Sequence, residues 1–150
     1  MRDLPLDETM TVLDVYCGVG LFSAFLAPRV KQLVGIEISP LSCADFVTNL
    51  DEYDYVSLYE APAEDVLTGM NFHPDVIIMD PPRDGLGAKA VEGILAQDAS
   101  YLAYFSCDPA TLSRDARRLI SGGYGLTKMV LFDMFPQTYH VESLTYWVRT

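Results

Sequence analysis

Short runs of hydrophobic residues alternate with helical patterns along the chain. The runs predict seven β-strands at 11–16, 32–38, 55–61, 75–80, 100–106, 126–135 and 142–149. Helical patterns begin near Gly20 and Pro40, cover 63–68, and extend from Pro109 to about Ile120, where Gly122 and Gly123 end the last helix. Strand–helix alternation of this kind is typical of an open, mostly parallel sheet with helices on both faces.

The last two predicted strands are joined by only a few residues. A parallel return needs a crossover connection of about a dozen residues or more, so we expect this pair to be antiparallel. No linker, repeat or low-complexity stretch interrupts the pattern. The sequence therefore predicts an α/β fold with residues 1–150 in a single domain.

The chain is acidic, with a formal net charge of −11 over 150 residues. A surface of this charge repels phosphate backbones unless its basic groups gather in one patch. The only dense basic cluster in the sequence is formed by Arg114, Arg117 and Arg118, at helical spacing. We therefore expect the chain alone to bind nucleic acid poorly, and any such substrate to need help from elements outside it.

Hydrophobic residues make up 50% of the chain, which is ordinary for a soluble globular protein. No apolar run is long enough to span a bilayer, and the N-terminus has no signal-peptide pattern. Three cysteines without regular spacing argue against a disulfide framework or a zinc site, and His73 and His140 have no matching partners for a metal. These features predict a cytoplasmic protein with no metal and no membrane association.

Polar or reactive residues stand at the ends of four predicted strands. Tyr16, Glu37, Asp80 and Cys107 end the first, second, fourth and fifth strand, respectively. In sheets of this kind ligands bind outside the carboxyl ends of the parallel strands. An antiparallel last strand begins at the same edge, which brings Glu142 there as well. Position in the sheet therefore predicts that these five residues converge on one rim.

The segment "DVYCGVGLFS" (14–23) follows the first strand. Gly18 and Gly20 permit a tight turn into a helix and the close approach of a ligand to the backbone. Ser23 replaces the third glycine of a dinucleotide fingerprint, so a pyrophosphate is not favoured. Glu37 at the end of the second strand is well placed to accept hydrogen bonds from two ribose hydroxyls. The combination indicates a cofactor that contains a nucleoside, with a purely structural turn as the alternative.

The segment "DPPRDGLG" (80–87) follows a buried strand. Its two prolines stiffen the backbone and remove amide donors, which leaves carbonyl groups and the Asp80 carboxylate facing the cleft. Such a rigid loop suits a flat heterocycle, although a proline-rich strand exit without function has the same composition. Arg83 is a candidate for contact with a phosphate or for an ion pair with Asp84 or another acid.

Cys107 lies between the end of a strand and a helix that starts near Pro109. Unpaired cysteines are mostly buried and inert, but the positive end of the helix points at this thiol and favours the thiolate. Cys17, in the glycine turn, and Cys43, on a helix, are interpreted as packing residues.

Five motifs together resemble the catalytic domain of the RNA uridine-5-methyltransferases, which make 5-methyluridine in tRNA or ribosomal RNA. The motifs are "VLDVYCGVG", "VGIEISP", "DVIIMDPPRDGLG", "YFSCDPATLSRD" and "DMFPQTYHVES", within roughly residues 11–148. The last two are specific, because general methyltransferases share the glycine turn but not Ser-Cys-x-Pro-x-Thr together with His-Val-Glu. The resemblance implies a Rossmann-like, seven-stranded S-adenosylmethionine-dependent methyltransferase fold with a reversed last strand.

The resemblance also implies roles for the residues of the rim. The nucleophilic cysteine of the family falls on Cys107, and its general base falls on Glu142. The implied S-adenosylmethionine contacts are Tyr16, Gly18, Gly20, Leu21, Glu37 and Asp80. In such enzymes a thiolate adds to carbon-6 of uracil in an RNA substrate, carbon-5 takes the methyl group, and a base then removes the carbon-5 proton.

The sequence departs from the family at Asp108, where asparagine is most common, and at Leu21, a position that is often polar. Full-length members carry an N-terminal RNA-binding module and an intervening domain, so we expect residues 1–150 to be a fragment. Catalysis of uridine methylation is the leading hypothesis, and a cofactor-binding fragment without RNA binding or turnover is the second. In a third, the Asp-Pro-Pro loop serves a base-amino methyltransferase, which leaves Cys107 and Glu142 without roles.

Overall fold

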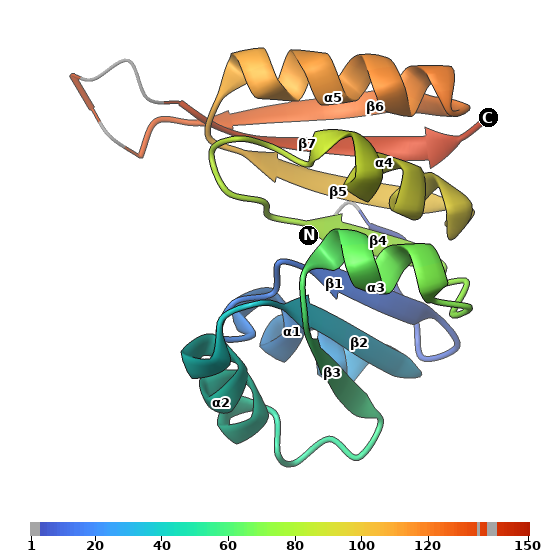
Figure 1. Cartoon of the computed structure of the whole chain (residues 1–150), viewed down its shortest axis with the longest axis vertical. Helices are drawn as coiled ribbons and strands as arrows, with labels where there is room; N and C mark the ends of the chain where they lie inside the picture. The colour runs from blue at the N-terminus through green and yellow to red at the C-terminus, as the bar shows by residue number, and fades with distance from the viewer. Residues whose placement is uncertain (1–3, 135, 138–140) are drawn as a thin grey trace.

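The computed structural model describes residues 4–134, 136–137 and 141–150. Its strands form one sheet in the order β3-β2-β1-β4-β5-β7-β6 (Figure 1). The strands are β1 (Thr11–Val15), β2 (Gln32–Glu37), β3 (Val56–Glu60), β4 (Val76–Met79), β5 (Tyr101–Ser106), β6 (Tyr124–Phe132) and β7 (Glu142–Arg149). The helices are α1 (Leu21–Leu26), the short 3-10 helix η1 (Ala27–Arg29), α2 (Pro40–Asn49), α3 (Ala63–Gly69), α4 (Gly87–Ala96) and α5 (Pro109–Ser121).

The first five strands are parallel, and β7 runs antiparallel to both of its neighbours, β5 and β6. This confirms the predicted mixed sheet with a reversed last strand. Since β6 forms the edge of the sheet, it joins the other strands through β7. Its pairing runs from Tyr124 to Phe132, whereas the hydrophobic pattern predicted 126–135, because the ladder with β7 begins at the pair Tyr124 and Arg149.

Helices cover both faces of the sheet, as predicted (Figure 1). On one face α3, α4 and α5 bury side chains such as Leu67, Ile94 and Leu119 against the strands. On the other face α1 and α2 contribute Leu26 and Phe46 to a second core. In the described part of the chain, no helix combines the length and apolarity that crossing a bilayer requires.

The position of β4 in the middle of the sheet explains why its sequence is continuously hydrophobic. Val76 and Ile78 face the core beneath α1 and α2, while Ile77 and Met79 face the core beneath α3, α4 and α5. All four side chains are buried. A parallel strand covered on both sides has no solvated face and therefore no polar alternation.

The hydrophobic pattern did not delimit α4, whose sequence contains two glycines. Gly93 lies where α4 crosses α3, and a Cβ atom at this position would lie 2.5 Å from the Cβ atom of Leu67. Only glycine permits this close approach of the two helices. The residue that weakens the helical signal in the sequence is therefore the one that the packing requires.

The predicted helix after β5 is confirmed as α5. Pro109 stands in its first turn, and the Asp108 carboxylate accepts hydrogen bonds from the amides of Ala110 (2.8 Å) and Thr111 (2.9 Å). Gly122 ends the helix by donating to carbonyl groups of the last turn. Asp108 is thus a regular N-cap, a position where aspartate is among the preferred residues.

Candidate active site

The structure brings the five predicted rim residues to one edge of the sheet. Tyr16, Asp80 and Cys107 directly follow β1, β4 and β5, and Glu37 ends β2. Glu142 begins β7, whose next residue pairs with the last residue of β5. The segments that hold these side chains are therefore adjacent, as the topology predicted.

On this rim the charge of one carboxylate acts on another. Burial by the surrounding protein raises the pKa of Asp80, and the negative charge of Glu142 raises it further. The Asp80 side chain is nevertheless open to solvent at the mouth of the site. The interaction agrees with the position of Glu142 at the start of β7, on the same edge of the sheet as the exit of β4.

The turn after β1 has an unusual backbone. Tyr16, a non-glycine residue, adopts a left-handed conformation with φ of 64°, followed by Gly18 at 54° and Gly20 at 86°. The amides of Tyr16 and Cys17 both donate to the carbonyl oxygen of Ile36, at 2.9 and 3.1 Å. A tyrosine held at positive φ is uncommon, and such strain is often found at functional sites.

Glu37 holds this turn in place. One carboxylate oxygen accepts from the amide of Gly18 (2.9 Å), and the other accepts from the amides of Ile38 (2.9 Å) and Ser39 (2.7 Å). The sequence had suggested ribose hydroxyls as its partners. A carboxylate offers about four acceptor positions, so three are occupied by backbone amides and about one is left for a ligand.

A small pocket of about 80 Å³ opens beside Tyr16 and Glu37. Its walls also include Ile38 and the segment 61–64, which follow β2 and β3. The sequence analysis did not select these residues, although their position just after two parallel strands was available as a signal. The side chain of Ile38 is 60% exposed, so it offers an apolar surface at the rim.

Tyr16 forms part of the wall of the pocket, and its hydroxyl remains protonated well above neutral pH. Burial raises the pKa of Tyr16 to about 12, with further contributions from the negative charges of Glu64 and Asp115. The phenol is therefore available as a hydrogen-bond donor. Leu21, the other predicted contact near this turn, is 62% exposed at the start of α1.

Cys107 is half-buried between β5 and α5. The sequence predicted that the positive end of α5 would act on this thiol, but the Asp108 carboxylate already caps the free amides of that end. These amide hydrogen bonds, chiefly the one from Thr111, hold the pKa of Asp108 below its usual value. The nearby positive charge of Arg83 acts in the same direction.

The other two cysteines have a different environment. Cys17 and Cys43 are both buried, as expected for packing residues. Burial raises the pKa of each thiol, and negative charges near each add to the effect. Cys43 also donates through Sγ to the carbonyl oxygen of Glu37 at 3.6 Å. Cys107 is thus the only one of the three that solvent reaches substantially.

The arginine cluster of the sequence is not a free basic patch. Arg114 and Arg118 form ion pairs with the buried carboxylate of Asp115, at 3.0 and 3.2 Å. Only Arg117 of the three points its charge to solvent without a hydrogen bond or ion pair in the described part of the structure. The pairing leaves little basic charge here to offset the overall charge of −11.

Of the two histidines, the structure describes only His73. His73 lies in the loop before β4, where its Nδ1 atom is 3.4 Å from the carbonyl oxygen of Gln97. His140 lies outside the described residues, together with Phe135, Thr138 and Tyr139 of the motif before β7. Within the described ranges, no group of three or more His, Cys, Asp or Glu side chains is arranged to hold a metal.

Asp14 is a buried carboxylate that the sequence analysis did not select. It lies in β1 beneath α1, where its Oδ2 atom accepts from the hydroxyl of Ser23 at 2.6 Å. Its Oδ1 atom has no hydrogen-bond partner among the described residues. Burial raises the pKa of Asp14 to about 7, against the lowering effect of Ser23 and with a further rise from the charge of Asp80.

We predict that Asp14→Asn changes the pH dependence of folding. The folded-state pKa of Asp14 is raised from 3.8 to about 7, so wild-type stability falls as pH rises through that interval. With about 1.4 kcal/mol per pH unit, roughly 3 kcal/mol is lost between pH 5 and pH 8. Asparagine does not ionise, so the variant should gain stability relative to wild type by this amount. Urea unfolding at both pH values measures it.

The matched control for this measurement is Asp45→Asn, on the exposed side of α2. Its stability relative to wild type should change little between pH 5 and pH 8. An Asp14→Asn variant whose stability difference from wild type is the same at the two pH values would show that Asp14 is ionised in the folded protein throughout this range.

Comparison with known proteins agrees with the fold and the motifs. The sequence model of the family described as tRNA (Uracil-5-)-methyltransferase matches residues 3–150. An uncharacterized RNA methyltransferase of Streptomyces coelicolor is 42% identical over 137 residues, which are 88% of this chain and 30% of that protein. One of Listeria innocua is 39% identical over 149 residues, which are 96% of this chain and 32% of that protein.

Solved structures resemble the chain over most of its length. The tRNA (uracil-54, C5)-methyltransferase of Pyrococcus abyssi, in complex with S-adenosyl-L-homocysteine, has a TM-score of 0.82 and 30% identity, over 95% of this chain and 35% of that one. The N-methyltransferase NodS of Bradyrhizobium japonicum has a TM-score of 0.78 over 96% of this chain and 88% of that one, but only 15% identity, which shows the fold alone.

These matches establish the fold and the family. The seven-stranded sheet is the methyltransferase fold that the motifs implied. The chain spans about a third of the length of the curated relatives that it matches. With a family model that covers nearly every residue, the chain belongs to the tRNA (uracil-5-)-methyltransferase family.

Proposed function

We propose that this chain is the catalytic domain of an RNA uridine-5-methyltransferase that uses S-adenosylmethionine. The observation that carries the proposal is the position of Cys107 and Glu142, a nucleophile and a base, on the edge of the sheet that also holds the strained turn at Tyr16. A methyltransferase that acts on a base amino group needs neither the thiol nor the second carboxylate. The family membership of the chain supports the same reaction.

The residues of the rim suit the proposed cofactor. The pocket of about 80 Å³ beside Glu37 and the exposed face of Ile38 offer an apolar surface for one part of the adenosine. The remaining acceptor position of Glu37 is available for a ribose hydroxyl. The Pyrococcus abyssi relative was solved with S-adenosyl-L-homocysteine, the demethylated form of the same cofactor. When bound, S-adenosylmethionine supplies an electrophilic methyl group on its sulfonium centre.

In the proposed reaction Cys107 acts first. Carbon-5 of uracil is a weak nucleophile, and addition of the Cys107 thiolate to carbon-6 converts the ring into an enolate whose carbon-5 attacks the methyl group. A covalent bond between Sγ and carbon-6 therefore exists when the methyl group has been transferred. Glu142 then removes the proton from carbon-5, and the electron pair of that bond expels the thiolate. A uridine within folded RNA must be turned out of its stack to reach this edge.

The charge of the chain bears on how RNA is bound. With a net charge of −11 and two of the three clustered arginines paired to Asp115, the chain offers little attraction for phosphate. We propose that RNA binding depends mainly on parts of the full-length protein beyond these 150 residues. The same observation favours the second candidate function, a domain that binds the cofactor but neither binds nor methylates RNA by itself.

Nucleoside analysis tests the reaction. RNA incubated with the full-length protein and labelled S-adenosylmethionine should contain labelled 5-methyluridine after digestion. A label on a base amino group would contradict the proposal in favour of the Asp-Pro-Pro alternative. If this chain binds S-adenosyl-L-homocysteine in calorimetry but the protein neither shifts RNA in a gel nor labels it, the fragment hypothesis holds instead.

We predict that Glu37→Ala weakens binding of S-adenosyl-L-homocysteine by roughly 10- to 100-fold. The change removes both the ribose acceptor and the carboxylate that fixes the glycine turn, and a charged hydrogen bond contributes about 1.5–3 kcal/mol. Isothermal titration calorimetry measures the dissociation constant. Glu52→Ala, an exposed position after α2, is the matched control and should bind as wild type does. Equal affinity of Glu37→Ala and wild type would exclude Glu37 from the cofactor site.

A further inference from the structure

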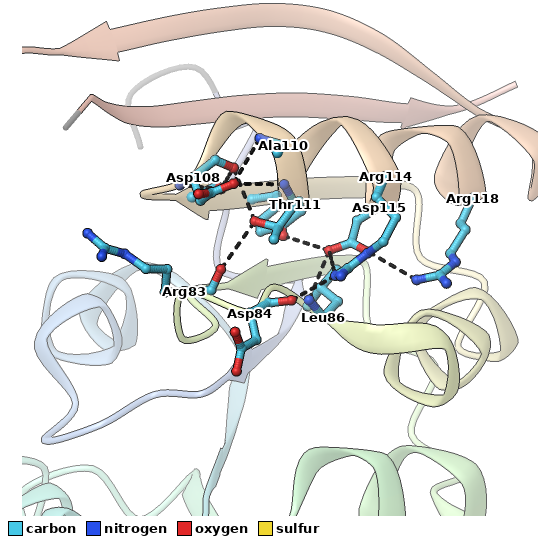
Figure 2. A network of polar contacts seen from close by, with 11 residues as sticks. Arg83, Asp84, Leu86, Asp108, Ala110, Thr111, Arg114, Asp115 and Arg118 are labelled. Atoms are coloured by element: carbon cyan, nitrogen blue, oxygen red, sulfur yellow. Dashed lines mark hydrogen bonds and ion pairs between the residues drawn. The ribbon is translucent and has the colours of Figure 1, made fainter. Parts of the chain in front are cut away.

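Polar contacts fasten α5 to the loop that follows β4 (Figure 2). The hydroxyl of Thr111 lies within hydrogen-bond distance of two carbonyl oxygens, that of Arg83 in the loop (3.3 Å) and that of Asp108 at the start of its own helix (3.1 Å). The guanidinium of Arg114 donates to the carbonyl oxygen of Asp84 at 2.8 Å. Further along the loop, the backbone amide of Leu86 donates to the carboxylate of Asp115. Three side chains on one side of the helix therefore hold backbone groups at three positions of the loop.

Asp115 is the centre of this network. Its Oδ2 atom accepts from the amide of Leu86 at 2.9 Å and from the hydroxyl of Tyr104 at 3.0 Å. Its Oδ1 atom accepts from Arg114 and Arg118. The carboxylate has no solvent exposure, whereas the two arginine side chains are 42% and 38% exposed. One buried charge thus joins the helix, the loop and β5.

The loop is built to approach this carboxylate closely. Gly85 has a φ of +74°, and a Cβ atom at this position would lie 2.5 Å from Oδ2 of Asp115. The amide of Gly85 donates to the carbonyl oxygen of Pro82 at 2.8 Å, which closes a tight turn. Burial of a charge costs free energy that an apolar contact would not. The buried carboxylate therefore indicates that the position of the loop relative to α5 matters more than the stability that the contact adds.

The loop after β4 and the helix α5, which Asp115 joins, each lie next to a residue of the rim. The loop begins at Asp80, and α5 begins two residues after Cys107. The negative charge of Asp115 also reaches Tyr16, whose pKa it helps to raise. A shift of α5 relative to the loop would therefore change the separation of the proposed nucleophile from the cofactor side of the site.

We propose that Asp115 is a positioning residue for the methyl transfer, an inference that rests on the function proposed above. Its buried carboxylate fixes α5 against the loop 80–86 and thereby holds Cys107 at a set distance from Asp80. Asp115 lies below the rim and makes its contacts with the loop, β5 and its own helix, so it acts through these elements and not on the substrate.

The physical part of the proposal is testable with this chain alone. In Asp115→Asn the amide of Leu86 should exchange its hydrogen at least 10-fold faster than in wild type, while the amide of Ile78 in β4 changes less than 3-fold. Arg117→Gln, on the same helix, is the matched control and should change neither. Nuclear magnetic resonance resolves the individual amides. Unchanged exchange at Leu86 would overturn the positioning role by itself.

The catalytic part is tested in the full-length protein by the rate at which Cys107 forms an adduct with 5-fluorouridine RNA. Asp115→Asn should slow this step 10- to 100-fold at saturating RNA and cofactor, with both dissociation constants within 3-fold of wild type. A purely structural role would instead lower the amount of active protein without changing the rate constant. A rate within 2-fold of wild type would overturn the proposal.

Thr111→Val keeps the inference testable if Asp115→Asn does not fold. It removes the hydroxyl that the carbonyl oxygens of Arg83 and Asp108 share, and it should slow adduct formation 3- to 10-fold. A Thr111→Val rate equal to wild type would count against the role of the α5–loop contacts. A wild-type protein that forms no adduct would overturn the proposed function, whereas the exchange of Leu86 would still decide whether Asp115 holds the loop.

Discussion

Replacement of Cys107 by alanine is expected to abolish the covalent adduct between the full-length protein and RNA that contains 5-fluorouridine. Fluorine at carbon-5 cannot be removed as a proton, so in the proposed mechanism the Sγ–carbon-6 bond persists and the complex survives denaturation. Without Sγ this bond cannot form. We expect methylation of ordinary RNA to fall at least roughly 1,000-fold, since the covalent route is lost. Denaturing electrophoresis detects the adduct, and label transfer gives the rate.

Cys43→Ala provides the matched control for this prediction. It makes the same chemical change at a buried thiol and should leave the adduct in place. Folding of both variants is compared by circular dichroism, because Cys107 is half-buried and its replacement leaves a small cavity. An adduct that persists in a folded Cys107→Ala protein would remove this residue as the nucleophile.

Replacement of Glu142 by glutamine should have the opposite effect on the adduct. The thiolate can still add and the methyl group can still be transferred, but the carbon-5 proton stays in place because an amide is a poor base. The methylated RNA should therefore remain attached to Cys107 even without fluorine. Turnover should fall by roughly 100- to 10,000-fold, the usual contribution of a general base. Mass spectrometry of the trapped complex should show the added methyl group.

Glu92→Gln, an exposed position on α4, is the control and should release methylated RNA at the wild-type rate. A Glu142→Gln protein that turns over normally would assign the proton transfer to another group on the rim. Asp80 would then be the first alternative, because its raised pKa favours proton uptake and the charge of Glu142 already acts on it.

The position of the rim residues was predictable because it follows from topology alone. The exits of β4 and β5 must lie at one edge of a parallel sheet, which places Asp80 near Cys107 without any knowledge of side-chain contacts. The short connection before β7 fixed the direction of that strand and hence the location of Glu142. These inferences use only element order and loop length, which the hydrophobic pattern reveals.

The contacts of individual side chains were not predictable in the same way. Asp115 lies among arginines at helical spacing, a pattern typical of a solvated helix face. It is buried because the loop around Leu86, 29 residues earlier, folds over it. Asp14 likewise reads as one residue of a strand, and its partner Ser23 belongs to the next helix. Burial of these two carboxylates depends on segments whose approach no local pattern encodes.

Glu37 shows an intermediate case. Its place at the end of β2 was predicted, but the suggested ribose partners did not anticipate that three backbone amides share its carboxylate. An acid at this position both shapes the glycine turn and faces the pocket. The sequence predicts the place of this residue at the end of β2, while the three amides that its oxygens accept from are known only from the coordinates.

The placement of β7 between β5 and β6 has a consequence for biosynthesis. On the ribosome, β1 to β5 can pair as they emerge, and the nascent chain then already carries Cys107 at a finished strand end. The edge strand β6 must wait, because its ladder is made with β7. Glu142, the first residue of β7, is therefore translated after Cys107 and after the whole of β6. In the proposed mechanism, the residue that forms the covalent bond to the pyrimidine is therefore in place before the residue that allows its release.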